Sequence, residues 1–215
     1  MKDKTGPIEK PIILAICGKS CAGKDTLTKW LAKYFESIGI PAHRMVSATT
    51  RPRRIGESEG DYIFMSEDFF KRNIKQNKFF ETTQFRGWYY GLFKSEIKPS
   101  TINIGVFDLR GMEHLYQHRI EYNIIPIYIK EDSLVRLKRS KDREHRWRLE
   151  HFRRMVVDDI HFRKADEKIK KFGKYIILDR PDGVWNSTLI IEDKLKRFKV
   201  LVINDEGRLR LGNFI

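Results

Sequence analysis

Uninterrupted apolar runs alternate with amphipathic stretches along most of this 215-residue chain. Residues 11–17 read PIILAIC without polar alternation, a pattern typical of a strand buried on both faces of a parallel sheet. A glycine-rich loop follows, and residues 25–39 then place large apolar side chains three and four positions apart. This spacing predicts an amphipathic helix that ends near Gly39.

The same order recurs three times further along the chain. Apolar runs at residues 102–108, 123–129 and 174–179 each precede a segment with helical periodicity. Strands that alternate with helices predict a parallel sheet with right-handed crossovers. The fold class expected is therefore α/β, a three-layer α/β/α domain whose sheet has about five parallel strands.

Three segments depart from this alternation. Residues 51–93 have the pattern of short antiparallel strands around one helix, which predicts an inserted lobe. A strongly basic helical stretch is expected to form a lid, and two strand-like runs around Gly207 predict a C-terminal hairpin. We expect one domain, with a core at 11–50, 101–135 and 155–197, the lobe at 51–93, the lid at 136–154 and the hairpin at 198–214.

Composition narrows the class of protein. Lys and Arg number 43 against 29 Asp and Glu, a formal charge of +14, which attracts nucleic acids and nucleotides alike. No apolar run is long enough for a transmembrane helix, and no signal-peptide pattern precedes residue 11. Only Cys17 and Cys21 are present, too few for a disulfide framework, so a cytoplasmic location without a membrane partner is expected.

The loop after the first strand carries the motif G-x-x-x-x-G-K. Glycines let successive backbone N–H groups turn inward around phosphate oxygens, and the lysine reaches the β- and γ-phosphates. Asp25 stands where a hydroxyl residue usually binds Mg²⁺, and its carboxylate is a suitable hard ligand for this cofactor. The ATP site is predicted at Gly18, Lys19, Ser20, Cys21, Ala22, Gly23, Lys24, Asp25 and Thr26.

A second anion site is predicted in the inserted lobe. Residues 47–57 read SATTRPRRIGE, with three arginines in four positions beside hydroxyl side chains. Guanidinium groups bind phosphate through two parallel hydrogen bonds, so this cluster is suited to a phosphorylated ligand.

Four motifs behind the phosphate loop resemble those of one known family. S-x-T-T-R-x-x-R-x-G-E, G-D-Y-x-F, F-x-E and Y-Y-G follow one another in this order, and the likeness runs from about residue 11 to 179. Together they resemble the GMP-binding motifs of guanylate kinases. The resemblance implies transfer of the ATP γ-phosphoryl group to GMP or dGMP, with Mg²⁺ as cofactor.

The resemblance also implies roles for individual residues. Ser47 and Glu81 would bind guanine, since a carboxylate accepts hydrogen bonds from N1–H and the 2-amino group, a donor pair that adenine lacks. The GMP site would comprise Ser47, Arg51, Arg54, Tyr62, Glu81, Tyr90 and Asp108. Three positions depart from the family pattern: Leu92 replaces a Ser or Thr that helps hold guanine O6, Val106 replaces an aspartate and Arg110 replaces a glutamine.

Lid arginines would stabilise the charge that develops on the transferring phosphoryl group. The resemblance places the first shortly after an R-L pair, at Arg139 or Arg143, and the second in a following helix, at Arg148 or Arg153. With Lys24, we take Arg139 and Arg148 as the predicted catalytic residues.

Other interpretations stay open at this stage. The acceptor could be another (deoxy)nucleotide or a sugar phosphate, as Leu92 and Val106 indicate, or the chain could be a non-catalytic binding module. Nucleic-acid binding fits the charge, but no recognisable reading motif accompanies it. His114 and His118 lie four apart on an expected helix without a metalloprotease pattern, and we predict that they are surface residues.

Overall fold

A five-stranded parallel sheet forms the centre of the computed structural model, which describes residues 10–54, 56–85, 87–144, 149–179, 181–203 and 208–212. The strand order is β2-β7-β1-β8-β9, and every pairing is parallel. All seven residues of the central strand β1 are buried, as its apolar run predicts. The strands are β2 (Ala42–Arg44), β7 (Ile102–Val106), β1 (Ile12–Gly18), β8 (Asn123–Lys130) and β9 (Ile176–Asp179).

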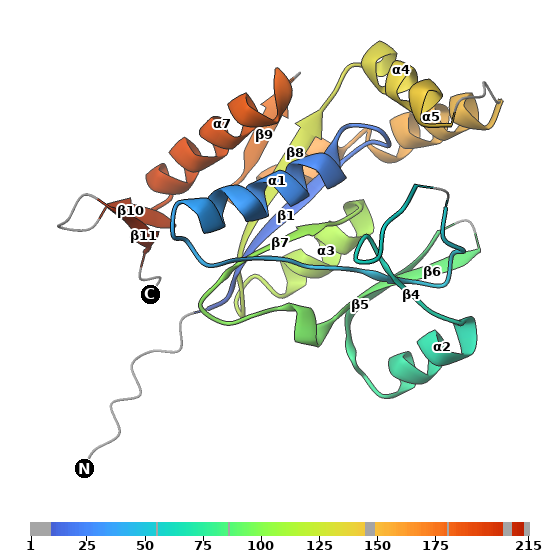
Figure 1. The fold of residues 1–215 in the computed structure, drawn as a ribbon, viewed down its shortest axis with the longest axis horizontal. Helices are drawn as coiled ribbons and strands as arrows, with labels where there is room; N and C mark the ends of the chain where they lie inside the picture. Colours follow the sequence, from blue (N-terminus) through green and yellow to red (C-terminus); the bar gives the residue numbers. More distant parts are fainter. Residues whose placement is uncertain are drawn as a thin grey trace.

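Helices cover both faces of this sheet (Figure 1). On one face α1 (Lys24–Ser37) and α7 (Gly183–Arg197) pack against alternate residues of β1 such as Leu14 and Ile16. On the other, α3 (Leu109–Gln117) and α6 (Ala165–Lys170) pack against Ile13 and Ala15. The prediction of a three-layer α/β/α fold is therefore confirmed.

A smaller sheet forms the inserted lobe, in the order β4-β3-β6-β5. Its β3–β6 and β5–β6 pairs are antiparallel, but β3 and β4 run parallel, which the expectation of purely antiparallel strands did not include. The arginine-rich loop between them carries the chain back to the start of β3. The elements are β3 (Ala48–Thr49), β4 (Ile63–Phe64), α2 (Glu67–Lys75), β5 (Phe79–Phe85), β6 (Trp88–Phe93) and the 3₁₀ turn η1 (Lys94–Glu96).

Two helices, α4 (Ser133–Glu144) and α5 (Leu149–His161), form the basic segment after β8. They lie beside the tip of the phosphate loop, at the same end of the molecule as the inserted lobe (Figure 1). Because the carboxyl ends of parallel strands meet at one edge, the loop after β1 and the segments after β7 and β8 share this end.

The chain closes with β10 (Leu201–Ile203) and β11 (Leu209–Leu211), an antiparallel pair that packs on the α1–α7 side of the core. Gly207, the expected turn residue, lies outside the described residues. Among the helices of the described ranges, none is both long and apolar enough to cross a membrane.

Candidate functional site

The phosphate loop connects β1 to α1 through a left-handed turn. Gly23 precedes the helix with a φ of 92°, a conformation that glycine adopts without steric cost. The Lys24 ammonium folds back over the loop and donates to the carbonyl oxygens of Gly18 at 2.8 Å and Lys19 at 3.0 Å. Burial lowers the pKa of Lys24, and the neighbouring carboxylates of Asp25 and Asp158 oppose this shift.

The remaining loop residues surround this lysine. Ala22 is buried and donates its amide to Lys19 at 3.2 Å, whereas Ser20 and Cys21 are partly exposed. Asp25 and Thr26 are exposed in the first turn of α1. This turn carries unpaired backbone N–H groups and the positive end of the helix dipole, so it is suited to phosphate oxygens.

Helix α5 places two carboxylates on the loop. The Ser20 amide donates to Asp158 Oδ2 at 2.7 Å, and the Lys19 ammonium lies 2.5 Å from Asp159 Oδ1. Both carboxylates also face the buried guanidinium of Arg136, at 3.5 and 3.4 Å. The carboxylate of Asp158 thus accepts a hydrogen bond from a backbone amide of the loop. Backbone amides of this kind are the groups that bind phosphate oxygens in such loops.

Arg139 reaches the same loop from α4. Its Nη1 donates to the Cys21 carbonyl at 3.3 Å and lies 3.0 Å from Glu131 Oε2. The predicted lid arginine is therefore next to the phosphate loop. Arg148, the second one, lies outside the described residues, and so does the side chain of Arg143; Arg153 is described and exposed.

Arg51 forms the centre of the arginine cluster in the lobe. Its side chain is only 8 % exposed and forms a bidentate pair with Glu57, at 2.7 and 3.1 Å. It also hydrogen-bonds to the side chain of Tyr90 and lies 5.4 Å from the centre of the Tyr62 ring. Arg54, at the rim, is exposed, and its backbone amide donates to Glu57.

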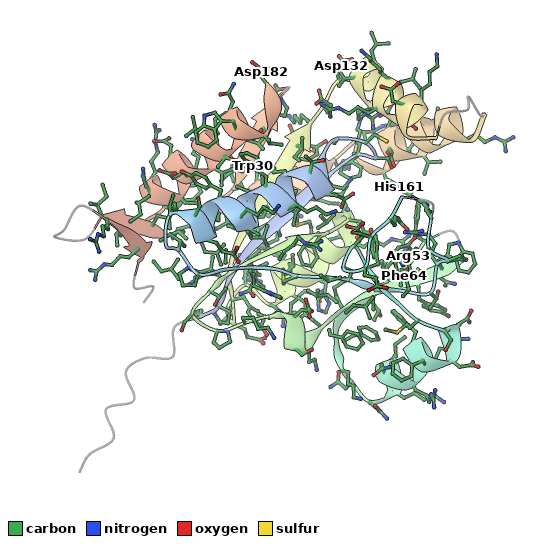
Figure 2. The ribbon with its side chains drawn as sticks, in the orientation of Figure 1. Trp30, Arg53, Phe64, Asp132, His161 and Asp182 are labelled. Carbon is green, nitrogen blue, oxygen red and sulfur yellow. The ribbon has the colours of Figure 1, made fainter. Side chains whose placement is uncertain are left out.

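Arg53, unlike Arg51, has an exposed side chain. Its guanidinium lies over the ring of Phe64, 5.9 Å from the ring centre, on the lobe surface (Figure 2).

Tyr62 connects the two anion sites. Burial raises the pKa of its phenol to about 12, the carboxylate of Asp25 raises it further, and Arg51 opposes the shift. Asp25 follows the phosphate-loop lysine, while Arg51 belongs to the arginine cluster. Asp61, directly before Tyr62, lies 2.5 Å from Lys29 of α1, so the lobe contacts the helix that begins at the phosphate loop.

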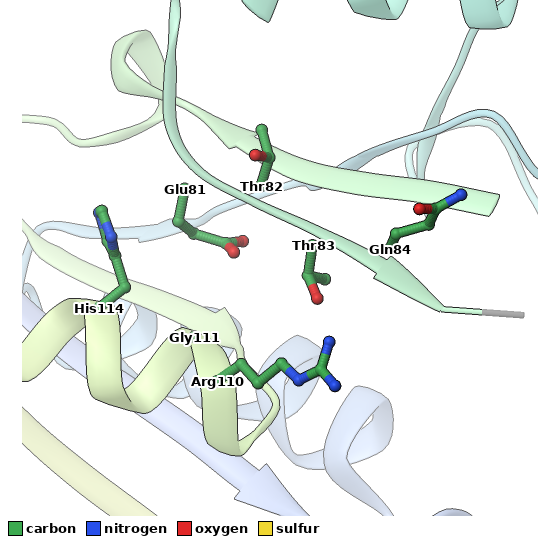
Figure 3. Close-up of a pocket in the computed structure, with 7 residues that line it drawn as sticks. All are labelled: Glu81, Thr82, Thr83, Gln84, Arg110, Gly111 and His114. Atoms are coloured by element: carbon green, nitrogen blue, oxygen red, sulfur yellow. The ribbon is translucent and has the colours of Figure 1, made fainter. Parts of the chain in front are cut away.

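Between β5 and the start of α3 lies a cavity of about 230 Å³ (Figure 3). Its walls include Glu81 and Thr83 from β5, and Arg110 and His114 from α3. Burial, together with the nearby Asp108 carboxylate, raises the pKa of Glu81 to about 7. The cavity is below the usual volume of a pocket for a whole ligand and is in scale with one heterocyclic base.

Of two more predicted GMP residues, Asp108 lies beside this cavity and Ser47 lies at the start of β3. Asp108 caps α3, accepting from the Gly111 amide at 2.7 Å. Ser47 directly precedes β3, and its carbonyl accepts from the Ile63 amide at 3.0 Å. The Phe107 amide, directly before Asp108, donates to the Ile16 carbonyl at 2.9 Å near the end of β1, so the start of α3 and the phosphate loop are neighbours.

Several residues of the site did not emerge from the sequence. Glu57 lies in the motif that identified the arginines, so its pairing could have been expected. His114 was predicted as a surface residue, which is wrong: it is partly buried, lines the cavity and hydrogen-bonds to the backbone of Phe80. Helix periodicity alone did not reveal that β5 packs against α3. Asp158 and Asp159 belong to no motif identified in the sequence.

Asp25, the predicted Mg²⁺ ligand, is exposed in the first turn of α1, next to the phosphate loop. Within the described ranges, no cluster of three or more His, Cys, Asp or Glu side chains could hold a metal by itself. This fits Mg²⁺, which usually takes one or two carboxylates and completes its shell with phosphate oxygens and water.

Comparison with known proteins agrees with this architecture. A guanylate kinase family model matches residues 8–180. The guanylate kinase of Mycoplasma genitalium is 32 % identical over 174 residues, 78 % of this chain and 69 % of that protein. The guanylate kinase of Thermotoga maritima is 27 % identical over 217 residues, covering 88 % and 95 %.

A solved structure supports the fold separately. The crystal structure of guanylate kinase from Anaplasma phagocytophilum superposes with a TM-score of 0.61 at 18 % identity, over 94 % of this chain and 91 % of that one. The family model covers most of the chain, including the phosphate loop, the arginine cluster and the base-sized cavity. This chain belongs to the guanylate kinase family.

Proposed function

We propose that this protein is a nucleoside monophosphate kinase that transfers the γ-phosphoryl group of ATP to GMP or dGMP, giving ADP and GDP or dGDP. The observation that carries the proposal is the contact between the two anion sites: Lys29, in the helix that begins at the phosphate loop, pairs with Asp61 of the lobe, next to Tyr62 and the Arg51–Glu57 pair. It means that a site suited to a triphosphate and a site suited to a monophosphate share one gap, as an in-line transfer between two nucleotides requires.

On this proposal the acceptor is held at both ends. Arg51, Arg54, Tyr62 and Tyr90 bind the GMP phosphate, and the Glu57 carboxylate, which pairs with Arg51, keeps that guanidinium oriented before the substrate arrives. Glu81 lines the base end, and Ser47 and Asp108 are proposed to complete it. An ionised Glu81 accepts from guanine N1–H and the 2-amino group, whereas adenine leaves a buried carboxylate without its donors.

ATP binds over residues 18–26. Lys24 neutralises charge on the β- and γ-phosphates, and Arg139, next to the loop, does the same for the transferring group. Arg148 is proposed as the second lid arginine. Asp25 is the proposed Mg²⁺ ligand, and the ion would supply charge neutralisation on the phosphates. The acceptor oxygen attacks phosphorus directly, so no covalent enzyme intermediate forms.

A coupled assay of ADP release with GMP, dGMP, AMP, UMP and CMP tests the proposal. We expect turnover of GMP and dGMP, loss of at least about 10³-fold in kcat for Lys24→Met, and a mainly KM-based loss for Arg54→Ala. Turnover of another acceptor without GMP would favour the related-kinase alternative. Absence of all phosphotransfer would favour a binding module. The likeness to guanylate kinases supports a cytoplasmic enzyme with small-molecule substrates.

A further inference from the structure

The proposed guanine-binding end of the site differs from the family motif at Leu92, which lies beside Glu81. Leu92 is the cross-strand partner of Glu81 in the β5–β6 pair, so both side chains face α3. Leu92 is only 2 % exposed and packs in the apolar core with Phe80. The position directly opposite Glu81 on β6 therefore offers no hydrogen-bonding side chain for guanine O6.

A charged group enters the cavity from the opposite wall. Arg110 is in the first turn of α3 and extends its guanidinium into the space below Glu81 and Thr83 (Figure 3). Asp108 caps this helix through the Gly111 amide, which holds the turn that carries Arg110. Within the described part of the chain, Arg110 forms no ion pair, and its side chain is exposed to the cavity.

We propose that Arg110 determines base specificity by donating two parallel hydrogen bonds to guanine O6 and N7 while Glu81 accepts from N1–H and the 2-amino group. O6 and N7 lie side by side on guanine, and the planar guanidinium fork matches that pair of acceptors. Adenine presents a donor in place of O6, so the same fork rejects it. This inference rests on the proposed function, because it assigns the base end of the same site.

Substrate analogues that lack one acceptor or one donor of guanine distinguish the Arg110 contact from the Glu81 contact. 7-Deaza-GMP lacks N7 and probes Arg110, whereas IMP lacks the 2-amino group and probes Glu81. We expect the parent protein to use GMP about tenfold better than 7-deaza-GMP in kcat/KM. Arg110→Ala should bring that ratio close to one and leave the GMP-to-IMP ratio unchanged. Arg110→Lys, which keeps a donor but not the fork, should give an intermediate ratio.

Two control variants complete the experiment. Arg119→Ala removes an exposed arginine just beyond the far end of α3, and we expect it to change neither ratio. Thr83→Val removes the hydroxyl that lines the same cavity. If Thr83→Val rather than Arg110→Ala abolished discrimination against 7-deaza-GMP, the assignment to Arg110 would be overturned.

The remaining outcomes are also decisive. An equal loss for all three substrates in Arg110→Ala would indicate a packing role and overturn the inference, as would unchanged ratios. Failure of the proposed function is distinguishable, because the parent protein would then turn over neither GMP nor its analogues. Thermal unfolding of each variant checks that the fold is retained. Because the Arg110 side chain is exposed, Arg110→Ala should leave the midpoint of thermal unfolding unchanged.

Discussion

At the scale of single residues, the surroundings of Glu81 favour its neutral form, whereas its proposed role requires the charged form. It lines a small cavity beside the carboxylate of Asp108, and this environment raises its pKa to about 7. Guanine recognition needs the ionised form, which accepts two hydrogen bonds. The site is therefore poorly solvated for a carboxylate until the base supplies its two donors.

The first prediction concerns pH. Lowering the pH through about 7 protonates Glu81, so the KM for GMP should rise about fourfold between pH 8 and pH 6.5. Initial rates at several GMP concentrations measure this change, with the KM for ATP as the internal control. Glu81→Gln should weaken GMP binding and flatten the profile. An equal pH dependence in Glu81→Gln would assign the titration to another group.

Glu81 should also reduce the stability of the empty protein. The folded-state pKa lies above the ordinary value of 4.5, so the unfolded chain releases this proton more readily and stability falls as the pH rises from 4.5 to about 7. We expect Glu81→Gln to raise the free energy of unfolding by about 1 to 2 kcal/mol at pH 8 and to have no such effect at pH 4.5. Urea denaturation at both values tests this difference.

At the scale of elements, the contact between α5 and the phosphate loop depends on a buried arginine in α4. Arg136 is 1 % exposed, and its charge is balanced by Asp158 and Asp159. Asp158 is largely buried and also accepts from the Ser20 amide, whereas the Asp159 side chain is 51 % exposed. The two carboxylates are adjacent in sequence but differ in solvation, so their contributions to stability should differ.

This difference gives a matched pair of variants. Asp158→Ala leaves a buried guanidinium without its less solvated partner and should lower the free energy of unfolding by about 3 kcal/mol. Asp159→Ala removes a screened charge and should cost less than about 1 kcal/mol. Chemical denaturation of both variants measures the contrast. Equal losses would show that the burial of Asp158 has no energetic consequence.

At the scale of the whole molecule, an ion pair between α1 and the loop before β4 joins the core to the inserted lobe. Lys29 of α1 lies 2.5 Å from Asp61 in the loop before β4. The hydrogen bond from Lys29, with that from the Ser58 amide, lowers the pKa of Asp61 to about 2. The pair therefore contributes stability above the ordinary pKa of 3.8, and this contribution is lost as the pH falls through about 2.

A double-mutant cycle of Lys29→Ala and Asp61→Ala tests this connection. Both side chains are partly exposed, so solvent screening should limit their coupling to about 0.5 kcal/mol at pH 7. The coupling should disappear near pH 2, where Asp61 is half protonated or more. A coupling that persists unchanged in acid would contradict an electrostatic origin.

The sequence alone determined the order of the elements and located the phosphate-loop motif and the arginine cluster along the chain. Unbroken apolar runs can be satisfied only by strands buried on both faces, so the parallel sheet follows from local pattern. The motif around Lys24 depends on local backbone geometry, and Arg51 lies in a local cluster of arginines, so both could be singled out before the fold was known, although the pairing of Arg51 with Glu57 was not foreseen.

The tertiary structure decided which distant segments complete these sites. Arg110 and His114 line a cavity with Glu81 only because β5 packs against α3, and Asp158 meets Ser20 only because α5 folds back over the loop, 138 residues away. No periodicity or motif encodes such contacts, since each depends on how separate elements pack. The raised pKa of Glu81 has the same origin: desolvation is a property of the assembled cavity and not of the residue.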